Sequence, residues 1–214
     1  MMGAARPAMA RLPDVGFWKL CGSGVGEGFT PIPNTSVYAI LAAWPSEEIA
    51  RRRVEEAGIF RRYRDHSVET WTVFLSATSA RGKWSGRAPF EVQEGAVQGP
   101  VAALTRATVK PSVALKFWGQ VPRISEVIGA DPNVIFKIGI GEVPLLHQVT
   151  FSIWPDTETM AQFARGNGPH GQAIKAVREG LWFKEELYAR FQVLGDVGTW
   201  EGRSPLQIED KAAA

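Results

Sequence analysis

The sequence predicts an α+β fold: two tandem ferredoxin-like repeats that form one dimeric α/β-barrel-type domain, with helices outside the sheet. The main observation is an internal repeat of three short segments, namely Gly-x-Gly-Glu, an apolar strand ending in Trp-Pro, and Trp-x-Gly-Arg. These segments lie at 24–27, 37–47 and 84–87 in the first copy and at 139–142, 148–158 and 200–203 in the second. Three segments in the same order make chance a poor explanation. Each copy therefore contains a strand, a strand, a helix and a strand in that order.

The first copy, residues 1–94, has clear signals for its middle elements. An apolar strand runs from Val37 to Trp44, and Ser46 after Pro45 is a good helix N-cap. The helical pattern then gives way to an aromatic, β-branched strand. When the two copies are aligned, about the first eighteen residues of the second copy have no counterpart in the first. We therefore expect the first repeat to lack its first strand, and either the natural protein to start upstream of Met1 or the sequence to come from a shortened gene model.

The second copy, residues 101–203, has the full set of elements. Val101 to Lys110 alternates like a strand, and Ser112 to Ile128 carries apolar residues at helical spacing. The strand from Gln148 to Trp154 leads to a helix that starts near Asp156, and a last strand follows. This order completes a βαββαβ unit. Gly95 to Pro100 is the expected linker, and 204–214 is the expected frayed tail.

Composition excludes several classes of protein. The 214 residues are 45% hydrophobic and 21% charged, which is typical of a globular chain, and the net charge of +2 gives no reason to expect a nucleic-acid partner. The lone Cys21 excludes an internal disulfide and a cysteine-based metal site, and favours a reducing compartment. The longest apolar runs are far shorter than the roughly 20 residues of a membrane span. The sequence predicts a cytoplasmic protein that is soluble or peripheral to a membrane.

One histidine stands out because the two copies differ around it. The Trp-Pro segments are 110 residues apart and the Trp-x-Gly-Arg segments 116, so the second copy carries an insertion between them. Within it, Gly168-Pro169 ends one helix and starts another, on which His170 and Ile174 share an apolar face. Two interpretations stay open at this point. His170 is either a core or cap residue, or a ligand.

The other histidines and motifs are less informative. His147 begins a strand, which favours a structural role, and His66 follows a charged run and suits a solvated turn. Three histidines, one cysteine and no HExxH-like spacing do not make a tetrahedral zinc site, whereas a haem needs one axial histidine. Glycines at every second position in Gly22–Gly28 match neither a P-loop nor a dinucleotide motif.

Several longer segments resemble the spheroidene monooxygenase family. They include 16–20 (GFWKL), 28–35 (GFTPIPNT), 136–144 (FKIGIGEVP), 147–156 (HQVTFSIWPD) and 182–191 (WFKEELYARF). The resemblance implies a haem-dependent monooxygenase of carotenoid biosynthesis in photosynthetic bacteria. Its reaction would oxidise C2 of acyclic carotenoids, spheroidene to spheroidenone, by two hydroxylations that use O2 and reduced ferredoxin. Family members begin with a further strand, in agreement with the gap in the first repeat.

The fold also resembles haem proteins of the dimeric α/β-barrel group, which include aldoxime dehydratases. In that group a histidine on a helix of the C-terminal half binds the iron, so the resemblance implies His170 as the haem axial ligand, with His147 as the alternative. Phe163, Ile174 and Trp182 are the candidate lining of the haem pocket, although ordinary core is the other interpretation of each aromatic residue.

Three alternatives stay open. The first is a haem lyase or dehydratase of the aldoxime dehydratase type, the second a cofactor-free monooxygenase on the same barrel, and the third a non-catalytic haem- or carotenoid-binding protein. A carotenoid substrate also implies peripheral contact with the inner or photosynthetic membrane, for which we expect exposed aromatic residues in Gly16–Leu20. A homo-oligomer is compatible with the sequence.

Overall fold

The structure is a computed structural model that describes residues 2–28, 30–119, 132–165 and 182–207. Its elements follow in chain order. They are α1 (Met2–Ala10), β1 (Phe17–Gly24), β2 (Pro33–Ala43), α2 (Glu47–Glu56), α3 (Gly58–Asp65), β3 (Trp71–Gly82), β4 (Val101–Val109), the 3₁₀ turn η1 (Pro111–Val113), β5 (Phe136–Gly141), β6 (His147–Trp154), α5 (Thr157–Arg165) and β7 (Phe183–Gly198).

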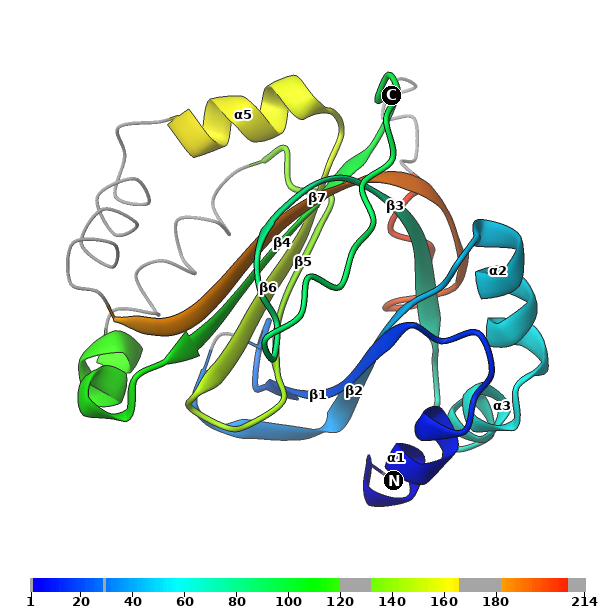
Figure 1. The fold of residues 1–214 in the computed structure, drawn as a ribbon, viewed down its shortest axis with the longest axis horizontal. Helices are drawn as coiled ribbons and strands as arrows, with labels where there is room; N and C mark the ends of the chain where they lie inside the picture. Colours follow the sequence, from blue (N-terminus) through cyan, green and yellow to red (C-terminus); the bar gives the residue numbers. More distant parts are fainter. Residues whose placement is uncertain (1, 29, 120–131, 166–181, 208–214) are drawn as a thin grey trace.

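The strands form one antiparallel sheet that curls into a half-barrel (Figure 1). Its strand order is β2-β1-β5-β6-β4-β7-β3, so strands of the first half flank the four strands of the second half on both sides. The halves meet where β1 pairs with β5 and where β3 pairs with β7. The α+β class predicted from the sequence is confirmed. Among the described residues, β2 and β3 are the two outer strands.

Alternation along the strands builds the core on the inner face of this sheet. In β6, Val149, Phe151 and Ile153 face this core, while Ser152 and Trp154 are buried on the opposite face; β7 alternates, with Leu187, Ala189 and Phe191 buried. Side chains from all seven strands belong to this one cluster. Alternating burial is what a strand with one covered face requires. The inner face therefore supplies most of the apolar burial in the described part of the chain.

The helices cover the outer face (Figure 1). Met9 of α1 and Ile59 of α3 pack with Leu20, whose side chain leaves β1 on the side opposite to Cys21. At the other end of the sheet, Met160 of α5 packs with Trp154. Among the described residues, no helix is long and apolar enough to span a bilayer.

The predicted helix starts are confirmed in atomic detail. The Ser46 hydroxyl accepts a hydrogen bond from the backbone N–H of Ile49 at 3.2 Å, and the Asp156 carboxylate accepts one from Thr159 at 2.7 Å. Such caps typically stabilise a helix by about 1 kcal/mol. The helix predicted over 112–128 begins as η1 and continues helically to Gly119. Its remaining residues lie outside the described part of the chain.

The two Trp-x-Gly-Arg segments adopt the same turn. In each one Trp and Arg form an isolated bridge, and the two residues between them have positive φ. The turn at 84–87 is held by Glu185, which accepts hydrogen bonds from its backbone N–H groups, and the turn at 200–203 is held in the same way by Glu69. Each turn is thus fixed by a carboxylate from the opposite half of the chain.

The expected exposure of the aromatic residues in Gly16–Leu20 is corrected by the structure. Phe17 is 5% exposed and points into the core, Leu20 is buried beneath α1, and Trp18 is half-buried. The reason is that this segment is β1, a strand covered on both faces. It does not supply an aromatic surface for a membrane.

Candidate functional site

The residues predicted for a haem pocket are only partly described. His170 and Ile174 lie outside the described residues. Phe163 is on α5, where its ring centroid lies 4.9 Å from that of Trp154. Trp182 precedes β7, is 4% exposed, and accepts a hydrogen bond from the Lys110 backbone N–H. The sheet register puts Phe163 and Trp182 near opposite ends of β4, so the structure does not bring these two residues together.

His66 and His147 have different surroundings. His66 caps the end of α3, where it is exposed and its Nδ1 lies 2.9 Å from the Arg62 carbonyl oxygen. This matches the predicted solvated turn. His147 is the first residue of β6, and it shares the inner face of the sheet with Val149 and Phe151. His147 therefore lies at the edge of the interior, with 28% of its side-chain surface exposed.

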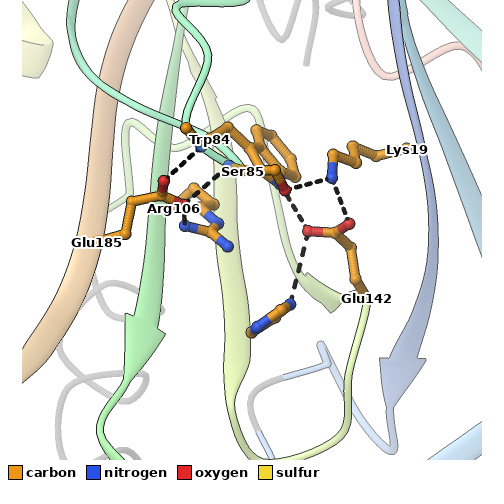
Figure 2. A network of polar contacts seen from close by, with 8 residues as sticks. Lys19, Trp84, Ser85, Arg106, Glu142 and Glu185 are labelled. Atoms are coloured by element: carbon orange, nitrogen blue, oxygen red, sulfur yellow. Dashed lines mark hydrogen bonds and ion pairs between the residues drawn. The ribbon is translucent and has the colours of Figure 1, made fainter.

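A cluster of charged side chains surrounds His147 on that inner face. We call it the interior cluster. It consists of Lys19, Trp84, Arg106, Glu142, His147 and Glu185, which come from β1, the segment just after β3, β4, the residue after β5, β6 and β7. Figure 2 labels all of them except His147. Five of the six are titratable, whereas the adjacent part of the inner face is apolar. Charged groups on a buried face need partners, because removing them from water is costly.

The first ion pair of the cluster joins Arg106 and Glu185. Arg106 is 1% exposed, and its guanidinium contacts the Glu185 carboxylate and lies 5.7 Å from the Trp84 ring. Glu185 also accepts hydrogen bonds from the backbone N–H groups of Ser85 and Gly86, at 2.8 and 2.7 Å. Desolvation opposes ionisation of Glu185, but the two N–H groups and Arg106 outweigh it and lower the pKa of this carboxyl. Glu185 is therefore a carboxylate at neutral pH.

The second ion pair joins Lys19 and Glu142. Their charged atoms are 2.7 Å apart, and Lys19 also donates to the Ser85 hydroxyl at 2.7 Å. The indole N–H of Trp84 donates to the same Glu142 carboxylate at 2.5 Å. Trp84 is fully buried, so its polar atom needs this acceptor. The two ion pairs give these four charges a net value of zero.

His147 completes the cluster as a neutral ring. Desolvation by burial is the main cause that lowers its pKa, and the charges of Arg106 and Lys19 act in the same direction, against Glu142 and Glu185. Its Nδ1 lies 3.8 Å from Glu142, which is too far for a hydrogen bond. Within the described part of the chain, His147 Nδ1 and Arg106 Nε are buried without a hydrogen-bond partner.

Cys21 lies beside the cluster but does not take part in its chemistry. It is completely buried, and desolvation, with a smaller contribution from Glu142, raises the pKa of its thiol to about 12. A thiolate is the nucleophilic and metal-binding form of cysteine. Cys21 is thus a small core residue.

Two cavities open near these elements. The first, of about 450 Å³, reaches the cluster through Lys19, Ser85 and Glu142 and is lined on its outer side mainly by residues 15–20 of β1 and its approach. The second, of about 400 Å³, lies between the end of β3 and α5, and Met160 and Phe191 line it. Neither of these two cavities is lined by His147.

These observations bear on whether a haem fits the described residues. His147 is neutral, as a ligand must be, but its Nδ1 is enclosed by the interior cluster and neither described cavity reaches it. No group of three or more His, Cys, Asp or Glu residues in the described ranges is arranged to hold a metal ion. Nδ1 of His147 is therefore closed to a haem iron, whereas 28% of the side-chain surface of His147 remains exposed.

Five members of the cluster were not predicted as site residues from the sequence: Lys19, Trp84, Arg106, Glu142 and Glu185. A signal was present for Arg106, because it falls in the same alternation phase as Ala102 and Leu104, which face the core. Glu185 was also detectable, because it stands 116 residues after Glu69, the same offset that separates the two Trp-x-Gly-Arg segments. Which carboxylate meets which cation was not detectable, since the partners are far apart in sequence.

Comparisons with known proteins give close relatives of one kind. The chain is 56% identical over 207 residues to a spheroidene monooxygenase of Cereibacter sphaeroides, covering 96% of this chain and 64% of that protein. It is 55% identical over 197 residues to the spheroidene monooxygenase of Rhodobacter capsulatus, covering 91% of this chain and 82% of that protein, and 33% identical to that of Rubrivivax gelatinosus, covering 92% and 75%. No family model matches the chain.

Solved structures resemble the chain only distantly. One is a putative monooxygenase of Fusobacterium nucleatum, with a TM-score of 0.45 and 10% identity. The superposition includes 94% of this chain and 89% of that protein. A putative monooxygenase of Lactobacillus acidophilus covers 92% of this chain with 89% of its own, at a TM-score of 0.39 and 12% identity. These values are too low to support an argument about the site.

Proposed function

The chain belongs to the spheroidene monooxygenase family, and from this membership we propose that it is an oxidoreductase that oxidises C2 of acyclic carotenoids such as spheroidene. The observation that carries the proposal is 55% identity to the Rhodobacter capsulatus protein, of which the chain covers 82%. The chain spans 64% of the Cereibacter sphaeroides protein.

The proposed reaction consists of two hydroxylations of the same carbon. Each hydroxylation replaces one C–H bond by C–OH, uses one O2, two electrons and two protons, and releases one water. The resulting geminal diol loses water to give the 2-oxo product. The electrons come from reduced ferredoxin in this proposal. An acidic electron carrier suits the chain's small positive charge of +2.

We assign the oxygen chemistry to a haem, with His170 as its proposed axial ligand. A haem iron held by a neutral imidazole supplies a site at which O2 is bound and reduced. The assignment of His170 rests on the sequence, because this residue lies at the start of a predicted helix in an insertion that only the second copy has. Ile174 remains a proposed lining residue, whereas Phe163 and Trp182 lie near opposite ends of β4 and would not both line one haem. His147 is the less favoured ligand because its Nδ1 is buried.

The interior cluster has a positioning role in this proposal. Its ion pairs connect β4 with β7 and β1 with the end of β5, and thereby fix the strands of the inner face relative to one another. The cluster has no net charge when His147 is neutral, so it adds little long-range field to the surrounding apolar core. A rigid inner face is a suitable support for binding a long apolar polyene.

The tandem arrangement of ferredoxin-like repeats also belongs to the proposal. Reciprocal contacts between the halves support it. Lys19 pairs with Glu142 of the second half, and Lys137 of the second half pairs with Glu27 of the first, both at 2.7 Å. In the same reciprocal manner, a glutamate of each half holds the Trp-x-Gly-Arg turn of the other half. In the second half β4 lies between β6 and β7, whereas no described strand fills the corresponding position between β2 and β3.

The test combines absorption spectra with product analysis. Protein produced with haem supplied should show a Soret band, which is lost or strongly shifted in His170→Ala and kept in His66→Ala, an exposed histidine that serves as the matched control. With O2 and reduced ferredoxin, the protein should convert spheroidene to hydroxylated and 2-oxo products.

Each alternative has its own outcome in these experiments. Product formation without reductant favours the lyase or dehydratase, and bound pigment without oxygen consumption favours the binding protein. Colourless but active protein refutes the haem assignment and leaves a cofactor-free oxygenase. Loss of the Soret band in His147→Ala alone would transfer the ligand role from His170 to His147.

A further inference from the structure

One end of the half-barrel exposes apolar side chains next to lysines. The helical segment after β4 carries Leu115, which is 92% exposed, and the hairpin between β5 and β6 carries Val143 and Leu145, which are 41% and 42% exposed. Figure 1 shows the segment and the hairpin at the same end of the molecule. The Trp118 indole N–H donates to the Leu145 carbonyl oxygen at 3.0 Å, so the two are in direct contact.

The segment after β4 carries lysines, although Glu185 and Glu186 lie nearby at the start of β7. Lys110 and Lys116 flank Leu115, and Lys116 is exposed with its Nζ 5.3 Å from the centroid of the Trp182 ring. No Asp or Glu occurs in 101–119 or in 143–155. Glu142, at the start of the hairpin, is occupied by Lys19 and Trp84 on the inner side. The lysines of this end thus have no acidic neighbour in these two segments.

We propose that this end lies on an anionic lipid bilayer, and we call it the Leu115 face: Lys110, Leu115, Lys116, Trp118, Val143 and Leu145. Three protruding apolar side chains suit the acyl boundary, a tryptophan held at its polar atom suits the headgroup level, and lysines suit anionic headgroups.

This inference rests on the proposed function, because an apolar carotenoid is stored in the bilayer. The face also lies near Trp182, a candidate residue of the haem pocket. Phe117, between Lys116 and Trp118, has its ring centroid 6.0 Å from that of Phe183 at the start of β7, next to Trp182. A carotenoid leaving the bilayer here would meet these aromatic residues first.

The binding test uses the full chain and vesicles, without turnover. Sedimentation with vesicles of phosphatidylglycerol and phosphatidylcholine should pull down the protein, and vesicles of phosphatidylcholine alone should bind it several-fold less. Leu115→Ser should lower the affinity about 10-fold, as expected for a large aliphatic side chain that loses its burial. Lys116→Gln should lower it about 5-fold, the typical contribution of one cation near an anionic membrane.

Val68 provides the matched control. It is fully exposed in the turn before β3 and does not belong to the Leu115 face, so Val68→Ser should bind vesicles like the wild type. Leu115 and Val68 are both surface residues, and circular dichroism of each variant should match the wild type. Equal vesicle binding by Leu115→Ser and wild type, or a loss of binding in Val68→Ser of the same size, overturns the proposal.

A second measurement locates the contact directly. Cys21 is completely buried, so a cysteine introduced at position 115 or 68 is the accessible thiol for an environment-sensitive fluorophore. Anionic vesicles should shift the emission of the Leu115→Cys conjugate to the blue and leave the Val68→Cys conjugate unchanged. An unchanged Leu115→Cys spectrum refutes the face. Oxidation of a carotenoid supplied in detergent tests the proposed function separately, so the two failures are distinguishable.

Discussion

The ion pair between Arg106 and Glu185 should respond unequally to removal of its two partners. Glu185→Gln leaves the Arg106 guanidinium in place, 1% exposed, without an anionic partner and with its Nε already unpaired among the described residues. Arg106→Met leaves the Glu185 carboxylate, whose side chain is 24% exposed and which keeps the N–H groups of Ser85 and Gly86. We therefore expect Glu185→Gln to be the more destabilising change.

The magnitudes follow from burial. Removing one partner of a buried ion pair typically costs 3–5 kcal/mol, and we take about 3 kcal/mol for Glu185→Gln because Gln retains one oxygen acceptor. For Arg106→Met we expect about 1 kcal/mol, because methionine preserves the apolar stem against Trp84 and solvent screens the remaining carboxylate. In a chain of this size the two changes correspond to losses in Tm of roughly 6–12 °C and roughly 2–4 °C.

Thermal and urea unfolding of the two single variants and the double variant measure this difference. The Tm and the urea midpoint of the double variant should be close to those of Arg106→Met, because removing the cation also removes the cost of leaving it unpaired. Equal destabilisation by the two single changes, or a greater loss in Arg106→Met, would refute the reasoning that desolvation of Arg106 dominates this pair.

Three further predictions concern the thiol, the imidazole and two glycines. Cys21, with its pKa at about 12 and no exposed surface, should resist iodoacetamide in the native protein and react once urea unfolds it, which mass spectrometry detects. The pKa of His147 is lower in the folded protein than its ordinary value of 6.5. Its contribution to stability is therefore present above pH 6.5 and is lost as the pH falls through the pKa of the folded state. Over this acidic range the urea midpoint of the wild type should fall more steeply than that of His147→Gln. Gly28 and Gly202 have similar positive φ, 87° and 82°, but their surroundings differ. A Cβ added at Gly28 would lie 1.9 Å from the Gly139 carbonyl oxygen, whereas a Cβ added at Gly202 would have no atom within 4 Å. We expect a cost of about 1 kcal/mol for Gly202→Ala and more than about 3 kcal/mol for Gly28→Ala in chemical denaturation, and similar losses would contradict the steric argument.

Local signals predicted the elements well. Ser46 and Asp156 cap helices as expected, and the alternating residues from Val101 to Lys110 form β4 with its apolar phase inward. These features depend on neighbours within a few residues, which sequence patterns record. The break between α2 and α3 at Ala57 and the helix α1 across Pro7 were not predicted, because packing on the outer face of β1 and β2 decides them.

The candidate site was predicted less completely. The aromatic segment Gly16–Leu20 was expected at a membrane surface, yet it is a strand covered on both sides. Exposed apolar residues lie in other places, and Leu115 and Leu145 are two of them. Strand alternation alone does not distinguish a strand with one covered face from a strand with two, because helix packing supplies the second cover. The assignment of His170 remains a prediction from the sequence.

The sequence by itself determined the α+β class, the repeated segments and the family, because each is written in local patterns or in direct identity to relatives. Only the tertiary structure decided that Lys19 meets Glu142 and Arg106 meets Glu185, and that each half fixes a turn of the other. The physical reason is that these partners are separated by 79 residues or more, and the curled sheet brings them to one buried face, where charge has to be matched.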